Sequence, residues 1–257
     1  MRSSGIHRRS RGRAPSAQPA LHKPHDQPVD VIHATGIEGA NQARGMAVVI
    51  DVLRSFTVSA YALVGGAQEC RLVTTTEEAR ALAASTPGAL LSAEENALPL
   101  AGIAISNSPT QIRATELQGR ILVQRSSAGT QVAAAVAPGV DIFAASLVVA
   151  RATVQACLSR HPAELTLIAS ADHPEDHACA RYMEALIRGE KADAYLLLQP
   201  LRDSERYARV MSGTWPGFPP TDIELALMLD RFNFAMPVTR EAGYLRLTKA
   251  DQPAVNG

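Results

Sequence analysis

The chain has 257 residues, 46% of them hydrophobic, and its 25 basic and 25 acidic residues balance. Its apolar runs are shorter than the ~18 residues that cross a bilayer, which argues against a membrane-spanning protein. Its three dispersed cysteines, Cys70, Cys157 and Cys179, argue against a disulfide framework and a thiolate zinc site and are typical of a reducing cytoplasm.

The charge is unevenly distributed along the chain. Six basic residues and no acidic ones lie in the first 25 positions, among Ser, Pro and Gly and without an apolar stretch. This composition predicts a disordered basic arm over residues 1–28. The rest of the chain is mildly acidic, so we expect no nucleic-acid partner.

From residue 29, short apolar runs alternate with helical segments. The predicted strands are Val29–His33, Met46–Asp51, Glu69–Val73, Ala89–Ser92, Arg120–Gln124, Val140–Ala144 and Leu165–Ala169. The predicted helices are Val52–Val64, Thr76–Ala84, Pro109–Leu117, Gly129–Ala137, Leu147–Arg160 and Pro174–Arg188. The Thr-Thr-Glu-Glu run that opens the second helix is a capping pattern, and a loop joins Glu94 to Ser108.

This alternation predicts an α/β fold with a mostly parallel sheet covered on both faces. After Gly189 the pattern becomes helical and ends in a hairpin. The expected helices are Asp193–Gln199, Asp203–Ser212 and Asp222–Leu229, and the hairpin strands are Met236–Arg240 and Tyr244–Thr248. We expect one domain over residues 29–248, followed by a flexible tail over 249–257.

Polar side chains gather where predicted strands end. Asp51 closes an apolar run, and Arg54 and Ser55 follow in the first turn of the next helix. A carboxylate that can hold a metal, beside a guanidinium that can hold an oxyanion, suggests phosphate chemistry. Glu94 and Arg125 stand at other strand ends. Because carboxyl ends of parallel strands share one edge, these groups are expected to converge.

Two helix starts offer anion-binding groups. Ser126, Ser127, Gly129 and Thr130 precede or begin a helix whose free backbone N–H groups would bind an anion. The alternative is that a hydroxyl simply caps this helix. Asn107-Ser108-Pro109 has the same two interpretations, with Ser108 as the cap.

The run Asp172–His177 suggests a metal. His173 and His177 are four residues apart, which would suit zinc on one helix face, although the run lacks the glutamate of a metalloprotease motif. Asp176 as an oxygen ligand of Mg²⁺ is the favoured interpretation, because Mg²⁺ prefers one or two carboxylates with water and substrate phosphate.

Taken together, these segments resemble the 2-phosphosulfolactate phosphatase family over most of residues 30–248. The resemblance rests on Val49–Arg54, Asn107-Ser108-Pro109, Gly129-Thr130, Ser146-Leu147, Glu175-Asp176 with Cys179-Ala180, and Gly189. It implies a three-layer α/β/α fold and Mg²⁺-dependent hydrolysis of a small phosphate monoester. The family's named substrate is 2-phosphosulfolactate, on a route to coenzyme M, and its members are often homo-oligomers.

The resemblance also implies residue roles. Asp51 would be a metal ligand or general base, and Asp176 a second acid and metal ligand. Arg54 would hold phosphate or sulfonate, Glu94 matches an acidic position, and Asn107, Ser108 and Thr130 would line the pocket. We add four substrate-binding candidates and Gly129 from the strand-end argument: Ser55, Arg125, Ser126 and Ser127.

Departures from the family pattern surround this expected pocket. They are Ala93, the stretch Arg125–Ala128, Val149 and the stretch Ala169–Ala171. They leave the expected fold unchanged but leave the substrate open. Two alternatives follow: a diverged, non-catalytic anion-binding protein of the same fold, or a zinc hydrolase that uses His173 and His177.

Overall fold

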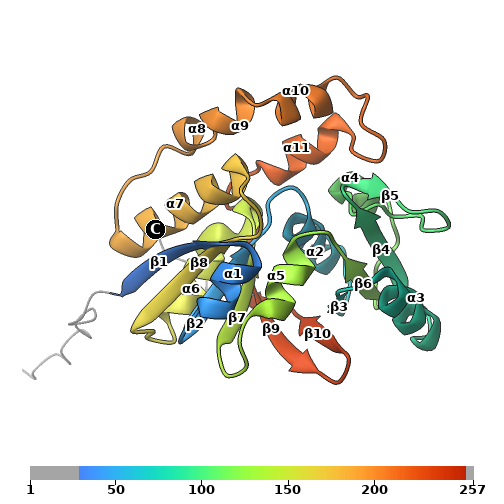
Figure 1. Cartoon of the computed structure of the whole chain (residues 1–257), viewed down its shortest axis with the longest axis horizontal. Helices are drawn as coiled ribbons and strands as arrows, with labels where there is room; N and C mark the ends of the chain where they lie inside the picture. The colour runs from blue at the N-terminus through green and yellow to red at the C-terminus, as the bar shows by residue number, and fades with distance from the viewer. Residues whose placement is uncertain (1–28, 253–257) are drawn as a thin grey trace, which may run out of the picture.

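The computed structural model of the protein describes residues 29–252. The predicted basic arm, residues 1–28, and positions 253–257 lie outside the described residues. A single large sheet forms the centre of the molecule (Figure 1). Its strands lie in the order β1 (Asp30–Thr35), β8 (Glu164–Ala169), β2 (Met46–Ile50), β7 (Asp141–Ala145), β9 (Phe234–Glu241), β10 (Tyr244–Leu247), β3 (Glu69–Val73), β6 (Ile121–Arg125), β4 (Leu90–Glu95) and β5 (Leu98–Pro99).

Two parallel groups of strands make up this sheet. The ladders β1–β8–β2–β7 and β3–β6–β4 are parallel, and the C-terminal hairpin β9–β10 joins them by antiparallel pairing on both sides. The hairpin occupies the middle of the sheet, a position that the order of elements in the sequence does not reveal. Because three successive antiparallel pairings separate β7 from β3, the two parallel groups run in opposite directions. The residues that follow β2 and β6 nevertheless meet, since the Gly129 amide donates to the Asp51 carboxylate at 2.9 Å.

Helices cover both faces of the sheet. One face packs against α1 (Gly36–Gln42), α2 (Ser55–Val64) and α5 (Gly129–Ala135), and the other against α6 (Ala150–Leu158) and α7 (Pro174–Arg188). Every residue of β2 is buried, as expected for a strand covered on both faces. The predicted α/β class, with a mostly parallel sheet between helical layers, is confirmed.

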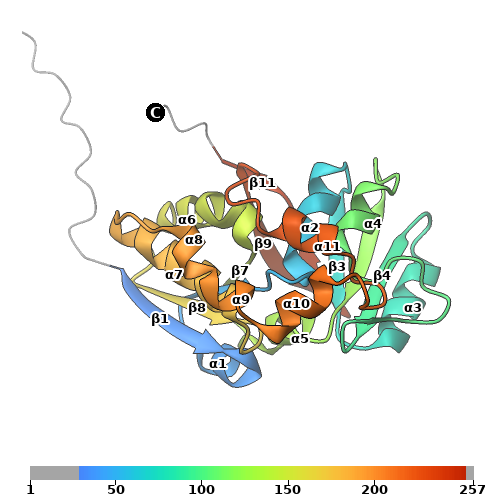
Figure 2. The ribbon, with the colours of Figure 1, turned by 90° about the horizontal axis from the view of Figure 1, so that it is seen from above.

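A C-terminal helical segment arches over one edge of the sheet (Figures 1 and 2). It contains α8 (Ala194–Leu197), α9 (Gln199–Arg202), α10 (Glu205–Met211) and α11 (Pro220–Ala226). The predicted helix Asp193–Gln199 corresponds to α8, whereas α9, with Pro200 in its first turn, was not predicted. Arg206 on α10 donates to the carbonyl of Leu53, just beyond β2, at 3.0 Å.

Several element boundaries differ from the prediction. Helix α2 begins at Ser55 rather than Val52, because the Asp51 carboxylate accepts the Ser55 amide. Helix α4 (Pro109–Arg113) is shorter than predicted, and α1 was not predicted. The expected tail is ordered at its start, where β11 (Ala250–Asp251) pairs with β9. The remaining helix, α3 (Thr76–Ser85), has the predicted capping box between Thr75 and Glu78.

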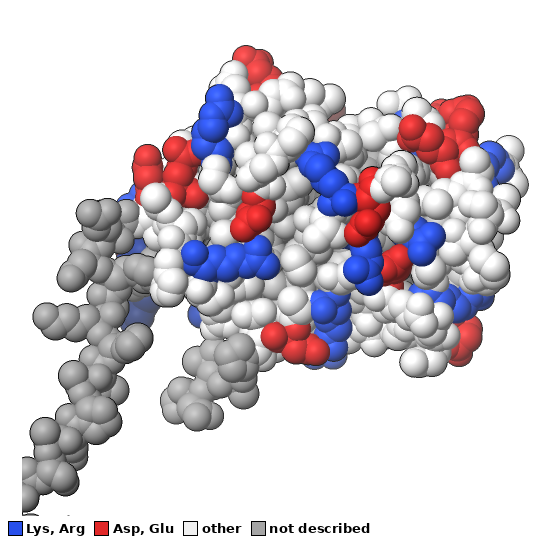
Figure 3. All heavy atoms as spheres, turned by 90° about the horizontal axis from the view of Figure 1, so that it is seen from below, with Lys and Arg blue, Asp and Glu red and all other residues white. Residues whose placement is uncertain are grey.

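The surface seen in Figure 3 mixes basic and acidic side chains. Within residues 29–252, each helix is too short or too polar to cross a membrane.

Candidate active site

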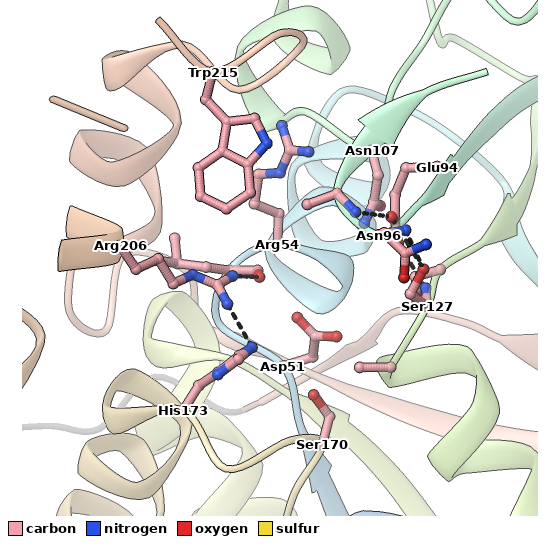
Figure 4. Close-up of a pocket in the computed structure, with 14 residues that line it drawn as sticks. Asp51, Arg54, Glu94, Asn96, Asn107, Ser127, Ser170, His173, Arg206 and Trp215 are labelled. Carbon is pink, nitrogen blue, oxygen red and sulfur yellow. Dashed lines mark hydrogen bonds between the residues drawn. The ribbon is translucent and has the colours of Figure 1, made fainter. Parts of the chain in front are cut away.

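A pocket of about 290 Å³ opens where β2 ends, beneath the C-terminal helical segment (Figure 4). Residues from six regions of the chain line it: the loop after β2, the β4–β5 turn, the loop before α4, the loop before α5, the loop after β8, and the segment around α10. Six of the predicted site residues are among them: Asp51, Arg54, Glu94, Asn107, Ser126 and Ser127. The expected convergence of strand ends therefore occurs.

Asp51 lies in the middle of the pocket (Figure 4). Its carboxylate accepts the amides of Ser55 and Gly129, each at 2.9 Å, and the residue is 4% exposed. Burial raises the pKa of Asp51, the charge of Glu94 raises it further, and the two amides and Arg206 oppose this. The carboxylate is thus held rigidly and is a better proton acceptor than an ordinary aspartate.

Two further carboxylates are buried next to Asp51. Asp176 accepts the Val52 amide at 2.8 Å and the Ser170 hydroxyl at 3.1 Å. Burial raises the pKa of Asp176 well above its ordinary value, with the charges of Asp51 and Glu175 adding to the effect. Glu175 is fully buried, and neither of its carboxylate oxygens has a hydrogen-bond partner. Asp51 and Asp176 offer carboxylate oxygens, the kind of donor that Mg²⁺ prefers together with water and substrate phosphate, although residues 29–252 contain no group of three or more acidic, His or Cys side chains placed around one metal ion.

On one side of the pocket, the Glu94 carboxylate accepts hydrogen bonds from its own turn and from the loop before α5. Glu94 accepts the amides of Ala97 at 2.5 Å and Ser127 at 2.6 Å, and also the Ser127 hydroxyl. Asn107 faces the same space and has the left-handed backbone expected of it, with φ of 56°.

The loop before α5 does not offer the row of free amides that we expected for an anion. The amide of Ser127 donates to Glu94, that of Gly129 to Asp51, and that of Thr130 to the Ser126 hydroxyl. Protein carboxylates already supply the negative charge that this helix start attracts. The Ser126 hydroxyl accepts the Thr130 amide and the Thr130 hydroxyl donates to the Ser126 carbonyl, but the N-cap residue of α5 is Ala128, which has no side-chain cap.

Arg54 lines the pocket, but its guanidinium is largely committed to the protein. It forms an ion pair with Asp222 at 2.7 Å and donates to the carbonyls of Gly217 and Ser106. The ring of Phe218 lies 3.9 Å from the guanidinium carbon. Arg54 is therefore an anchor for the pocket wall, and its expected contact with phosphate or sulfonate stays a prediction.

The other predicted site residues lie behind the pocket wall rather than on its surface. Ser55 and Gly129 position Asp51 through their amides, and Ser108 caps α4 and donates to Asp222. Arg125 donates to the carbonyls of Thr74 and Glu94. These residues support the site from outside the cavity.

Two residues that sequence reasoning did not place in the pocket form the side opposite Glu94 (Figure 4). They are Arg206 from α10 and Trp215 from the loop after it. Ser170, just after β8, lies below Asp51 and belongs to the stretch Ala169–Ala171 that was expected around the pocket. His173, considered earlier only as a zinc ligand, lies beside them and contacts Arg206. The sequence held one indication that Arg206 faces inward. Arg206 stands four residues before the apolar Val210, which is buried, and residues four apart lie on the same face of a helix.

The zinc interpretation is wrong for the described part of the chain. Residues 29–252 contain no group of three or more His, Cys, Asp or Glu side chains placed to hold a metal ion. The two histidines also have different partners, because His173 contacts Arg206 while His177 contacts Asp172 at 2.8 Å. Burial and the charge of Arg206 lower the pKa of His173 to about 4.

Comparison with known proteins identifies relatives of this chain. Residues 32–212 match the model of the family described as 2-phosphosulpholactate phosphatase. Three curated proteins, each described as "Probable 2-phosphosulfolactate phosphatase", are similar. The one from Bacillus subtilis is 32% identical over 145 residues, 55% of this chain and 64% of the relative. The one from Deinococcus radiodurans is 33% identical over 124 residues, 48% of this chain and 52% of the relative.

The third relative, from Carboxydothermus hydrogenoformans, is 30% identical over 147 residues, 56% of this chain and 61% of the relative. The chain thus spans about half to two thirds of the length of these relatives. The family match covers the pocket-lining residues from Asp51 to Arg206 and ends before Trp215. The chain therefore belongs to the 2-phosphosulfolactate phosphatase family.

Proposed function

We propose that the protein is a phosphatase that hydrolyses a small phosphate monoester, 2-phosphosulfolactate or a related phosphorylated hydroxy acid. The products would be inorganic phosphate and the hydroxy acid. The observation that carries this proposal is the Asp51 carboxylate, fixed by two amides in the middle of a polar pocket, in a chain of this family. Rigid placement of charged groups supplies most of the rate in phosphoryl transfer.

The ion in this proposal is Mg²⁺, bound by Asp51, which lines the pocket, and by Asp176, which is buried beside it. Each oxygen of Asp51 accepts one amide and keeps a second lone pair, and Asp176 lies close enough for the two charges to affect each other. These two carboxylates would hold the ion. When bound, Mg²⁺ would neutralise phosphate charge and activate water.

The protein's own groups have separate tasks in this scheme. Asp51 would act as a ligand of the ion, since a bound cation lowers the pKa of the carboxylates that hold it. Arg206 places positive charge on the opposite side of the pocket (Figure 4), where it offsets the charge of an anionic substrate. Asn107 and Ser127 offer polar groups that orient the substrate.

The test is phosphate release from 2-phosphosulfolactate, phospholactate and phosphoglycolate, with Mg²⁺ and with EDTA. Asp51→Asn is compared with Asp141→Asn, which removes an exposed carboxylate outside the pocket. We expect release that needs Mg²⁺ and falls by about 10²-fold or more in Asp51→Asn, with Asp141→Asn unchanged. If the folded wild-type protein releases phosphate from none of these esters, the non-catalytic anion-binding alternative replaces the proposal.

A further inference from the structure

The two sides of the pocket have opposite charge (Figure 4). Glu94 lines one side, next to the Ser127 loop, and Asp51 lies between the two sides. Arg206 faces them from α10, with the indole of Trp215 next to it. A substrate in this pocket therefore meets carboxylates on one side and a cation with an N–H donor on the other.

The protein positions Arg206 but leaves it accessible. Its guanidinium donates to the Leu53 carbonyl at 3.0 Å, contacts His173 and lies 3.7 Å from the fully buried Glu175. Its side chain keeps 21% of its surface exposed. Arg54, by contrast, has a side chain that is 2% exposed and is paired with Asp222.

Two hydrogen-bond donors on this side of the pocket have no partner. The Arg206 Nε and the Trp215 Nε1 are buried and have no hydrogen-bond partner among the described residues. Buried donors without acceptors are unfavourable, and both belong to residues that line the pocket. A planar or tetrahedral oxyanion supplies the missing acceptors, and arginine binds such groups through two parallel N–H bonds. His173 is neutral at neutral pH, so the positive charge here belongs to Arg206.

We infer that Arg206, assisted by Trp215, is a specificity-determining residue that binds a second acidic group of the substrate, a carboxylate or sulfonate. This inference rests on the proposed phosphatase function. The phosphate would lie near Asp51, and the second acid would lie against α10. Because Glu175 lies 3.7 Å from Arg206 and offsets part of its positive charge, this position suits a singly charged acid better than a phosphate dianion.

Matched substrates test this assignment. Phospholactate and isopropyl phosphate are esters of similar secondary alcohols, but only phospholactate carries a carboxylate. In Arg206→Gln we expect the KM for phospholactate and 2-phosphosulfolactate to rise 10- to 100-fold, and kcat/KM to fall at least tenfold more for these two acids than for isopropyl phosphate. Arg206→Lys should restore part of the loss, since it keeps the charge but lacks the planar fork.

The control variant is Arg202→Gln. Arg202 belongs to the same helical segment, and its guanidinium donates a hydrogen bond to the Tyr195 carbonyl outside the pocket. It should behave like the wild-type protein with every substrate. Equal losses for phospholactate and isopropyl phosphate in Arg206→Gln would make Arg206 a phosphate ligand or a structural residue and overturn the inference. No loss with either ester would also overturn it.

Direct binding separates this inference from the proposed function. Titration calorimetry with sulfolactate and lactate needs no turnover. If the wild-type protein releases no phosphate, sulfolactate binding that weakens at least tenfold in Arg206→Gln, but not in Arg202→Gln, would still support the acid-binding subsite. Equal binding to all three proteins, or no binding to the wild type, would reject it. Circular dichroism of each variant shows that the fold is retained.

Discussion

Arg54 and Asp222 form an ion pair of 2.7 Å whose side chains are 2% and 0% exposed. The pair links the end of β2 to α11, which are 168 residues apart in the chain. Asp222 also accepts the Ser108 hydroxyl at 2.7 Å and the Thr110 amide at 3.0 Å. One carboxylate therefore holds together the loop after β2, the start of α4 and the C-terminal helical segment, and so fixes the wall of the pocket.

Asp222→Asn should destabilise the protein by about 3–5 kcal/mol, because it leaves the Arg54 charge buried without its partner. Urea unfolding measures this free energy. The control is Asp141→Asn, which breaks an exposed pair with Arg160 at 3.2 Å and should cost no more than about 1 kcal/mol. Equal costs for the two variants would mean that the buried pair contributes no more than the exposed one.

Asp176 should make stability depend on pH. Burial and the charges of Asp51 and Glu175 raise its pKa in the folded protein above the value in the unfolded chain. The folded state therefore binds the proton more tightly. The resulting stabilisation is fully present below the unfolded pKa, about 4, and is lost as pH rises through the folded pKa.

Asp176→Asn should remove this loss of stability with rising pH. The asparagine can still accept the Val52 amide through its oxygen and donate to the Ser170 hydroxyl through its nitrogen. In EDTA, the unfolding free energy of the variant relative to wild type should increase steadily from pH 4 upward. Urea midpoints across pH 4–9 measure the difference. A difference that is independent of pH would contradict the raised pKa of Asp176.

The element order was largely predictable because buried strands and amphipathic helices leave clear local patterns. Helix α1 left none, since it contains Gly36 and Gly39 and buries only Ala40. The central position of the β9–β10 hairpin was also hidden, because strand neighbours depend on pairings between distant segments. Local patterns specify elements, whereas the sheet order depends on contacts that no local window contains.

The residues of the candidate site were likewise predictable only in part. Asp51 and Glu94 were predictable because each stands at the end of an apolar strand. The strands β2 and β4 run in opposite directions, so the meeting of these two residues does not follow from a shared sheet edge. Arg206 and Trp215 were not, because they reach the pocket from a helical segment that carries no motif. Arg54 was placed in the pocket correctly, but its pairing with Asp222, far along the chain, was not foreseeable.

The capping box of α3 offers a test of a feature read directly from the sequence. Thr75 accepts the Glu78 amide at 3.1 Å, and Glu78 accepts the Thr75 amide at 3.0 Å. Thr75→Ala should cost about 1 kcal/mol of unfolding free energy, the usual value for a lost cap. Thermal unfolding measures the shift. Thr75→Ser, which keeps the hydroxyl, is the control and should stay close to wild type.

Gly129 tests whether the exact placement of the Asp51 carboxylate matters. A Cβ at this position would lie 2.6 Å from Asp51 Oδ2 and 2.9 Å from the Ser55 Cβ. Because both neighbours are buried and hydrogen-bonded, Gly129→Ala should push the carboxylate away from the Gly129 amide. Misplacing a catalytic group by about 1 Å can cost on the order of 10² in rate.

We therefore expect kcat for phosphate release to fall about 100-fold in Gly129→Ala, measured with the ester that the wild-type protein hydrolyses fastest. Ala128→Gly, at the neighbouring position, is a useful control because it removes a side chain and adds no clash. Circular dichroism and urea unfolding separate a local displacement from loss of the fold. A Gly129→Ala protein that is folded and fully active would show that the Asp51–Gly129 contact does not set the geometry of the reaction.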